Sequence, residues 1–143
     1  MTGTGLHPRL RNDSHYLGNL PLCAVLLMHN AALPWFVLVP DVSATELCDL
    51  DDAAHATLQE ETRLLARFVR SHFNVDKLNV AAIGNIVRQL HMHVVGRFVD
   101  DYCWPGVVWG TAHAARYEPA QLDDIRAALS GALGEAFRAR HDG

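Results

Sequence analysis

Two histidines spaced two positions apart, His91 and His93, are the residues of this chain best suited to chemistry. They lie in an alternating segment, residues 89–97, with the sequence Gln-Leu-His-Met-His-Val-Val-Gly-Arg. In an extended strand one side carries Leu90, Met92 and Val94, and the other carries Gln89, His91, His93, Val95 and Arg97. Because a strand rises about 3.3 Å per residue, the two imidazoles stand roughly 6 to 7 Å apart, within reach of one phosphate or one metal ion. The same spacing is compatible with two histidines that only hydrogen-bond to the backbone of a half-buried sheet.

The residues around the two histidines favour the first interpretation. Gln-Leu-His-Met-His-Val-Val resembles the signature of the histidine triad family of nucleotide-binding proteins and nucleotidyl hydrolases, His-φ-His-φ-His-φ-φ, where φ is apolar. Every position matches except the first, where Gln89 replaces a histidine. Residues 77–85 resemble the asparagine-containing strand and glycine loop of that family, and residues 104–110 resemble the aromatic tail of one bacterial branch. The resemblance covers roughly residues 14–115.

The resemblance implies a role for each triad position. His91 matches the nucleophile, which forms a nucleotidyl-imidazole that water hydrolyses to a nucleoside monophosphate. His93 matches the histidine that contacts the phosphate or the bridging oxygen. Gln89 retains the main-chain carbonyl that orients the nucleophile, but its side chain cannot carry a proton through pH 7. The substitution is therefore expected to affect rate more than binding.

The resemblance also implies which residues bind the nucleotide. Asn30 is the best match to the residue that binds the ribose hydroxyls, and Asn79, Gly84 and Asn85 are expected to position the phosphates. Asn30 and the Gly84-Asn85 pair each have a simpler alternative, since asparagine is common in turns for its backbone geometry and Gly-Asn is typical of a hairpin turn. Trp35 falls where many relatives carry a further histidine near the phosphates.

Composition indicates one domain, residues 1–143. The chain has 143 residues, 50% of them hydrophobic, which suits a single buried core. A net charge of −4 provides no broad basic field, so nucleic acid is not an expected partner. The chain has neither an 18-residue apolar run nor a signal-peptide pattern, so we expect no membrane association. Three widely spaced cysteines, Cys23, Cys48 and Cys103, suggest free thiols in the cytoplasm.

The patterns of apolar residues predict an α+β fold similar to that of the histidine triad family. Two strands are expected within residues 14–28: a short strand, then a turn, then a strand at 22–28. Further strands are expected at 34–39, 77–83 and 89–97. These form a mainly antiparallel sheet of about five strands. One long helix, from Asp51 to about His72, packs on it.

Two further helices are predicted at the ends of the chain. Residues 7–13 are expected to form a short helical turn, and a last helix should extend from about residue 118 to 138. Its apolar stripe covers either its own subunit or a partner, and resemblance to dimeric relatives implies a homodimer. Trp104 and Trp109 are expected to anchor a loop or a subunit contact rather than to bind substrate.

Three hypotheses about function follow. The leading one is a hydrolase or nucleotidyl transferase that cleaves a dinucleoside polyphosphate, such as diadenosine tetraphosphate, or a nucleoside phosphoramidate through a covalent nucleotidyl-histidine, without a metal or other cofactor. The second is a purine-nucleotide-binding regulatory module with little turnover, which Gln89 and Trp35 favour. The third is a metal protein in which His91 and His93 gain a further ligand such as His29 or His113.

Overall fold

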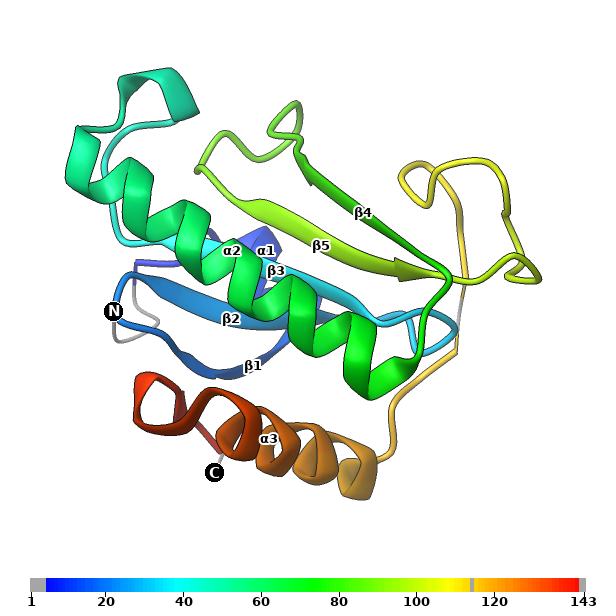
Figure 1. Cartoon of the computed structure of the whole chain (residues 1–143). Helices are drawn as coiled ribbons and strands as arrows, with labels where there is room; N and C mark the ends of the chain where they lie inside the picture. The colour runs from blue at the N-terminus through cyan, green and yellow to red at the C-terminus, as the bar shows by residue number, and fades with distance from the viewer. Residues whose placement is uncertain (1–4, 114, 142–143) are drawn as a thin grey trace.

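The computed structural model describes residues 5–113 and 115–141, and its centre is a six-stranded sheet in the order β4-β5-β3-β2-β1-β6 (Figure 1). Neighbouring strands are antiparallel at every pairing. The strands are β1 (Ser14–Asn19), β2 (Cys23–Met28), β3 (Trp35–Pro40), β4 (Lys77–Ala82), β5 (Met92–Arg97) and β6 (Arg138–Ala139). The predicted α+β fold and the five predicted strands are confirmed, and β6 is additional.

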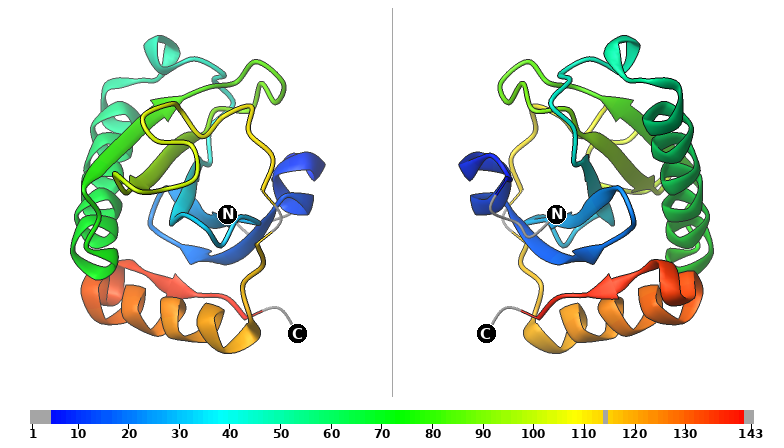
Figure 2. Two further views of the ribbon diagram at one scale, coloured as in Figure 1. Left: turned by 90° about the vertical axis from the view of Figure 1, so that its right-hand side faces the viewer. Right: turned by 90° about the vertical axis from the view of Figure 1, so that its left-hand side faces the viewer.

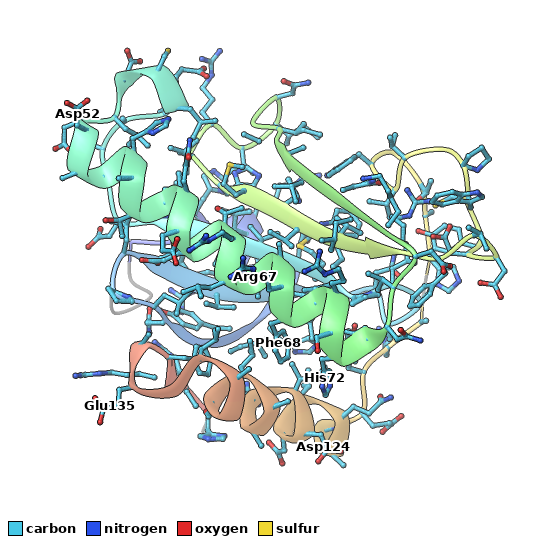
Figure 3. The ribbon with its side chains drawn as sticks, viewed as in Figure 1. Asp52, Arg67, Phe68, His72, Asp124 and Glu135 are labelled. Atoms are coloured by element: carbon cyan, nitrogen blue, oxygen red, sulfur yellow. The ribbon has the colours of Figure 1, made fainter. Side chains whose placement is uncertain are left out.

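The long helix α2 (Asp52–Phe73) covers one face of the sheet. Its start is fixed by Asp51, whose carboxylate accepts a hydrogen bond from the main-chain N–H of Ala54 at 2.7 Å, and it ends at Asn74 in the left-handed conformation. Figure 3 shows Asp52 at the first turn and His72 near the last, an arrangement that complements the helix dipole.

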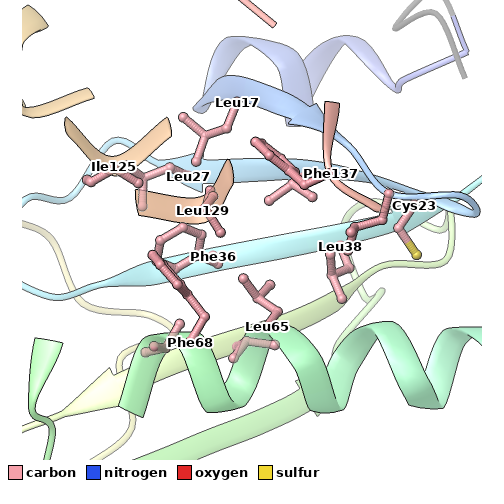
Figure 4. Close-up of a cluster of buried hydrophobic side chains, with 14 of the residues drawn as sticks. Leu17, Cys23, Leu27, Phe36, Leu38, Leu65, Phe68, Ile125, Leu129 and Phe137 are labelled. Carbon is pink, nitrogen blue, oxygen red and sulfur yellow. The ribbon is translucent and has the colours of Figure 1, made fainter. Parts of the chain in front are cut away.

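The main hydrophobic core lies between this face of the sheet and the helices α2 and α3 (Pro119–Leu133). Figure 4 shows side chains from the sheet meeting Leu65 and Phe68 of α2 and Ile125 and Leu129 of α3. The apolar stripe of the last helix therefore covers its own subunit.

The last helix is shorter than predicted. It ends at Leu133, because Gly134 adopts a φ of 60° that turns the chain away from the helix. A 3₁₀ turn (Gly134–Ala136) then leads into β6, which pairs with Gly18 and Asn19 of β1. Phe137, which lies within the predicted range of this helix, is still buried in the core, although the helix does not continue to residue 138.

The opposite face of the sheet carries the two histidines. Leu90, Met92 and Val94 face the α2 core, as the alternation predicted, and His93 and Val95 point the other way. The short helix α1 (Pro8–Asn12) lies on this second face, across the sheet from α2 (Figure 2). The loop that follows β5 packs there as well, through Val108 and Trp109.

The histidine strand begins later than predicted, at Met92 rather than Gln89. Its pairing with β4 ends at Ala82 opposite Met92, so residues 83–91 form the connection between the two strands. Gly84 and Asn85 thus belong to a wide loop rather than to a two-residue hairpin. Within the described ranges, no helix is long and apolar enough to span a membrane.

Candidate functional site

His91 and His93 lie together at the beginning of β5, on the sheet face opposite α2. His93 is paired with Val37 of β3 on one side and with Ala81 of β4 on the other. The two imidazole rings are 4.9 Å apart between centroids, and only 5% and 6% of the two residues is exposed. They are closer than regular strand spacing implies, since His91 precedes the first residue of the strand.

The ring of His91 is held by the main chain two residues before it. Its Nδ1 lies 2.6 Å from the carbonyl oxygen of Gln89. A carbonyl can only accept, so Nδ1 carries the proton and Nε2 holds the lone pair of the neutral ring. The carbonyl that was expected to orient the ring of His91 is therefore present at Gln89.

The side chain of Gln89 is engaged elsewhere. Its Oε1 accepts from the main-chain N–H of His7 at 2.8 Å, and its Nε2 donates to the main-chain carbonyl of Gly5 at 2.8 Å. Leu6, between these two residues, is buried on the second face of the sheet. Gln89 thus contributes its carbonyl to His91 and its amide to the anchoring of residues 5–7.

Nδ1 of His93 accepts a hydrogen bond from the indole Nε1 of Trp35 at 2.9 Å, so the proton of the neutral ring must reside on Nε2. The main chain of Ile83 lies near the same ring. Burial, followed by the proximity of His91, lowers the pKa of His93 to about 4. His93 is therefore neutral at physiological pH.

A cavity of about 430 Å³ lies beside His91, a volume within the range of small-ligand sites. Two loops form most of it: residues 45–48, between β3 and α2, and the connection between β4 and β5. The connecting loop contributes Gly84, Asn85 and Arg88. A Cβ at Gly84 would lie 3.1 Å from the carbonyl oxygen of Val87, so this loop is tightly folded where it borders the cavity.

The structure brings His91, Gly84 and Asn85 to one cavity, but Asn30 and Asn79 lie outside it. The Asn30 amide accepts from the main-chain N–H of Ala32 and donates to the Tyr102 hydroxyl, both at 3.1 Å. It follows the end of β2, near the start of β3, whereas the register of β3 and β5 places His91 near the end of β3.

Asn79 belongs to a buried polar network further along the sheet. Its Oδ1 accepts from Arg97 Nη1 at 2.9 Å, and Asn79 is paired with Val95 of the neighbouring strand β5. Arg97 in turn forms a buried ion pair with Asp101 at 2.9 Å. The amides of Asn30 and Asn79 are thus both used in intramolecular hydrogen bonds.

Three features of the site were not predicted: the 45–48 loop, Arg88 and the bond between Trp35 and His93. The 45–48 loop carries no motif, and Arg88 differs from other surface arginines only in its proximity to the triad segment. Trp35 was noted as a departure from the family pattern, but its partner is 58 residues away in sequence.

Residues 5–113 and 115–141 contain no group of three or more histidine, cysteine or acidic side chains placed to hold a metal ion. The rings of His29 and His113, the further ligands that the metal hypothesis requires, pack against His15 and Tyr102 instead. The metal hypothesis gains no support from this arrangement.

Comparisons with known proteins agree with the fold and with the family that the sequence resembles. The model of the HIT domain family matches residues 9–100. A solved histidine triad protein from Marinobacter aquaeolei VT8 is 40% identical, with a TM-score of 0.85, and the match covers 92% of this chain and 96% of that chain. One from Bradyrhizobium japonicum is 37% identical, with a TM-score of 0.85, and the match covers 90% of this chain and 96% of that chain. One from Sinorhizobium meliloti 1021 is 36% identical, with a TM-score of 0.87, and the match covers 93% of this chain and 99% of that chain. The chain matches no curated protein. On the family match and these three likenesses, the chain belongs to the HIT domain family.

Proposed function

We propose that this HIT domain protein is a nucleotide hydrolase that transfers a nucleotidyl group to water through a covalent intermediate on His91. The observation that carries the proposal is the 2.6 Å contact between His91 Nδ1 and the Gln89 carbonyl. It fixes the tautomer in which Nε2 is nucleophilic, in a histidine that lines a cavity of nucleotide size.

The reaction proceeds in two steps. Nε2 of His91 attacks the α-phosphorus, an N–P bond forms, and the bond to the leaving group breaks with its electron pair departing on that group. The Gln89 carbonyl stabilises the Nδ1–H of the now positively charged ring. Water then attacks the phosphorus, the N–P bond breaks, the water proton passes to solvent, and a nucleoside monophosphate leaves.

The cavity supplies the groups that hold the phosphates. Main-chain N–H groups of the Gly84–Asn85 loop are suited to phosphate oxygens, as in other anion-binding loops. Arg88 adds an exposed guanidinium, for which the described residues include no hydrogen-bond or ion-pair partner. The proposed substrates are dinucleoside polyphosphates, such as diadenosine tetraphosphate, or nucleoside phosphoramidates.

A second candidate is a purine-nucleotide-binding regulatory module with little turnover. Two observations favour it: the Gln89 side chain is committed to residues 5–7, and Nδ1 of His93 accepts a hydrogen bond from Trp35. This candidate retains the pocket and the orientation of His91 but lacks a proton donor.

We also propose that the protein is a homodimer in the cytoplasm. Strand β4 is an edge strand, with Val80 44% exposed on it and Ile86 73% exposed in the following loop. Antiparallel pairing of two β4 edges around a two-fold axis would satisfy the free strand edge and cover these side chains. The three cysteines are unpaired, as is usual in a reducing compartment.

The test is AMP release from diadenosine tetraphosphate and from adenosine phosphoramidate by the native protein and by His91→Asn, with AMP binding measured on both. His72→Asn, an exposed histidine of α2 on the other face of the sheet, is the matched control. Turnover that His91→Asn abolishes without loss of binding supports the proposal. Binding without turnover favours the regulatory module, and absence of both contradicts the nucleotide assignment.

A further inference from the structure

The side chains nearest to His91 offer no proton to a departing group. His93 uses Nδ1 to accept from Trp35, which leaves its ring in the neutral Nε2–H form. The amide of Gln89 does not ionise, so it cannot transfer a proton to a leaving group, and it is hydrogen-bonded to residues 5–7.

The other groups around His93 do not supply an acid either. Its ring contacts are His91 at 4.9 Å, Trp35 at 5.8 Å and Trp109 at 5.3 Å between centroids. Further along the same face, the carboxylate of Asp101 is paired with Arg97. Apart from His91, the charged or ionisable side chains among the described residues that line the cavity are Glu46, Cys48 and Arg88. All three are exposed to solvent.

We propose that this site is specialised for leaving groups that depart without a proton, and that Trp35 is the positioning residue that, in this buried setting, holds His93 in its neutral Nε2–H form. The inference rests on the proposed function and narrows its substrate class. It selects phosphoanhydrides, such as dinucleoside polyphosphates, over phosphoramidates.

The chemistry of the two leaving groups explains the selection. When His91 attacks diadenosine tetraphosphate, the P–O bond breaks and the electron pair remains on a phosphate oxygen of ATP, whose pKa of about 6 makes it a stable anion without protonation. When His91 attacks adenosine phosphoramidate, the P–N bond breaks and the nitrogen must gain a proton to leave as ammonia. A positioned general acid typically contributes about 10²- to 10⁴-fold, and its absence penalises only the second substrate.

The first arm of the test compares kcat/KM of the native protein for these two adenosine substrates, both of which yield AMP. We expect the anhydride to be preferred by about 10²-fold or more. Comparable values for both substrates overturn the inference and leave the proposed function intact. If the protein turns over neither substrate, the proposed function is overturned, and this inference with it.

The second arm removes the indole N–H with Trp35→Phe. Loss of the hydrogen bond to the neutral form should raise the pKa of His93. The ratio of kcat/KM for the phosphoramidate to kcat/KM for the anhydride should then increase by about tenfold or more, and phosphoramidate hydrolysis should gain a new dependence on pH. Trp109→Phe is the matched control, since this tryptophan also contacts the His93 ring but donates no hydrogen bond to it. An unchanged substrate ratio in a folded Trp35→Phe variant overturns the inference, as does an equal change in the control.

A measurement on the native protein covers the case in which Trp35→Phe does not fold. The ¹⁵N shifts of His93 should report the Nε2–H tautomer, unchanged between about pH 8 and 5. Protonation of His93 within that range, or a proton on Nδ1, overturns the inference.

Discussion

Replacing Asp101 with asparagine should be among the most destabilising single changes in this protein. Asp101 receives two hydrogen bonds from Arg97, from Nε at 2.9 Å and from Nη2 at 3.0 Å, and both side chains are only 2% exposed. Its carboxylate also accepts from the main-chain N–H groups of Phe98 at 3.0 Å and Cys103 at 3.2 Å. The ion pair therefore fixes the loop that follows β5.

The expected cost of Asp101→Asn is about 3 to 5 kcal/mol of unfolding free energy, because the substitution leaves the buried guanidinium without a countercharge. Asn79→Ala removes one amide partner of the same guanidinium and should cost less, about 1.5 to 3 kcal/mol. Urea unfolding gives both values from shifts in midpoint at constant m-value. A loss below about 1 kcal/mol in Asp101→Asn would refute the assignment of this pair as a buried, tightly coupled ion pair.

The same pair makes an acid-dependent prediction. The guanidinium of Arg97 lowers the pKa of Asp101 from 3.8 to about 2. A depressed pKa contributes stability above the unfolded value, and the contribution disappears as pH falls towards the folded value. The stability difference between the native protein and Asp101→Asn should therefore shrink by about 2 kcal/mol between pH 5 and 2. A difference that is constant with pH would contradict this.

Four other substitutions test the supports of the site and the core. Gln89→Ala should increase amide exchange at residues 5–7 while AMP release stays within about threefold, because the carbonyl that orients His91 is main chain; loss of turnover would assign the side chain a direct role. Gly96→Ala places a Cβ 2.5 Å and 2.7 Å from two side chains and should cost about 1 to 3 kcal/mol in thermal unfolding. Gly131→Ala, with open space around it in α3, should instead be neutral or stabilising. Glu61→Ala deprives two main-chain N–H groups of their acceptor and should cost about 2 to 5 kcal/mol by urea unfolding, and a loss near zero would show that water replaces the carboxylate.

The parts of the fold that sequence predicted well are specified by neighbouring residues. The long helix has acidic residues at its start, basic residues at its end and an apolar stripe between them, and its observed bounds differ from the predicted ones by about one residue. The alternation around His91 was likewise enough to assign the two faces of β5. Local periodicity determines these features, so no tertiary knowledge was needed.

Boundaries that depend on distant partners were predicted less well. The last helix ends at Gly134, and the chain then forms β6 because β1 offers a free edge beside Gly18. Phe137 continues the apolar pattern of this helix past the break, so the pattern alone favoured a longer helix.

The contacts of the candidate site likewise divide into those between near neighbours in sequence, which could be predicted, and those between distant residues, which could not. The bond between His91 and the Gln89 carbonyl joins residues two positions apart, and a short motif is sufficient to predict it. The partners of Asn30 and Asn79 are Tyr102 and Arg97, which only the folded chain brings to them. Both amides are therefore engaged, outside the cavity, by side chains distant in sequence.

The central claim is that His91 becomes covalently attached to the nucleotide. The most direct measurement is rapid mixing of the native protein with diadenosine tetraphosphate, acid quenching, and mass spectrometry of the intact chain and its peptides. We expect one adenylyl group on the peptide that contains His91, formed at least as fast as AMP is released, and none in His91→Asn. Release of AMP without an adduct on His91, or turnover retained by His91→Asn, would contradict the account.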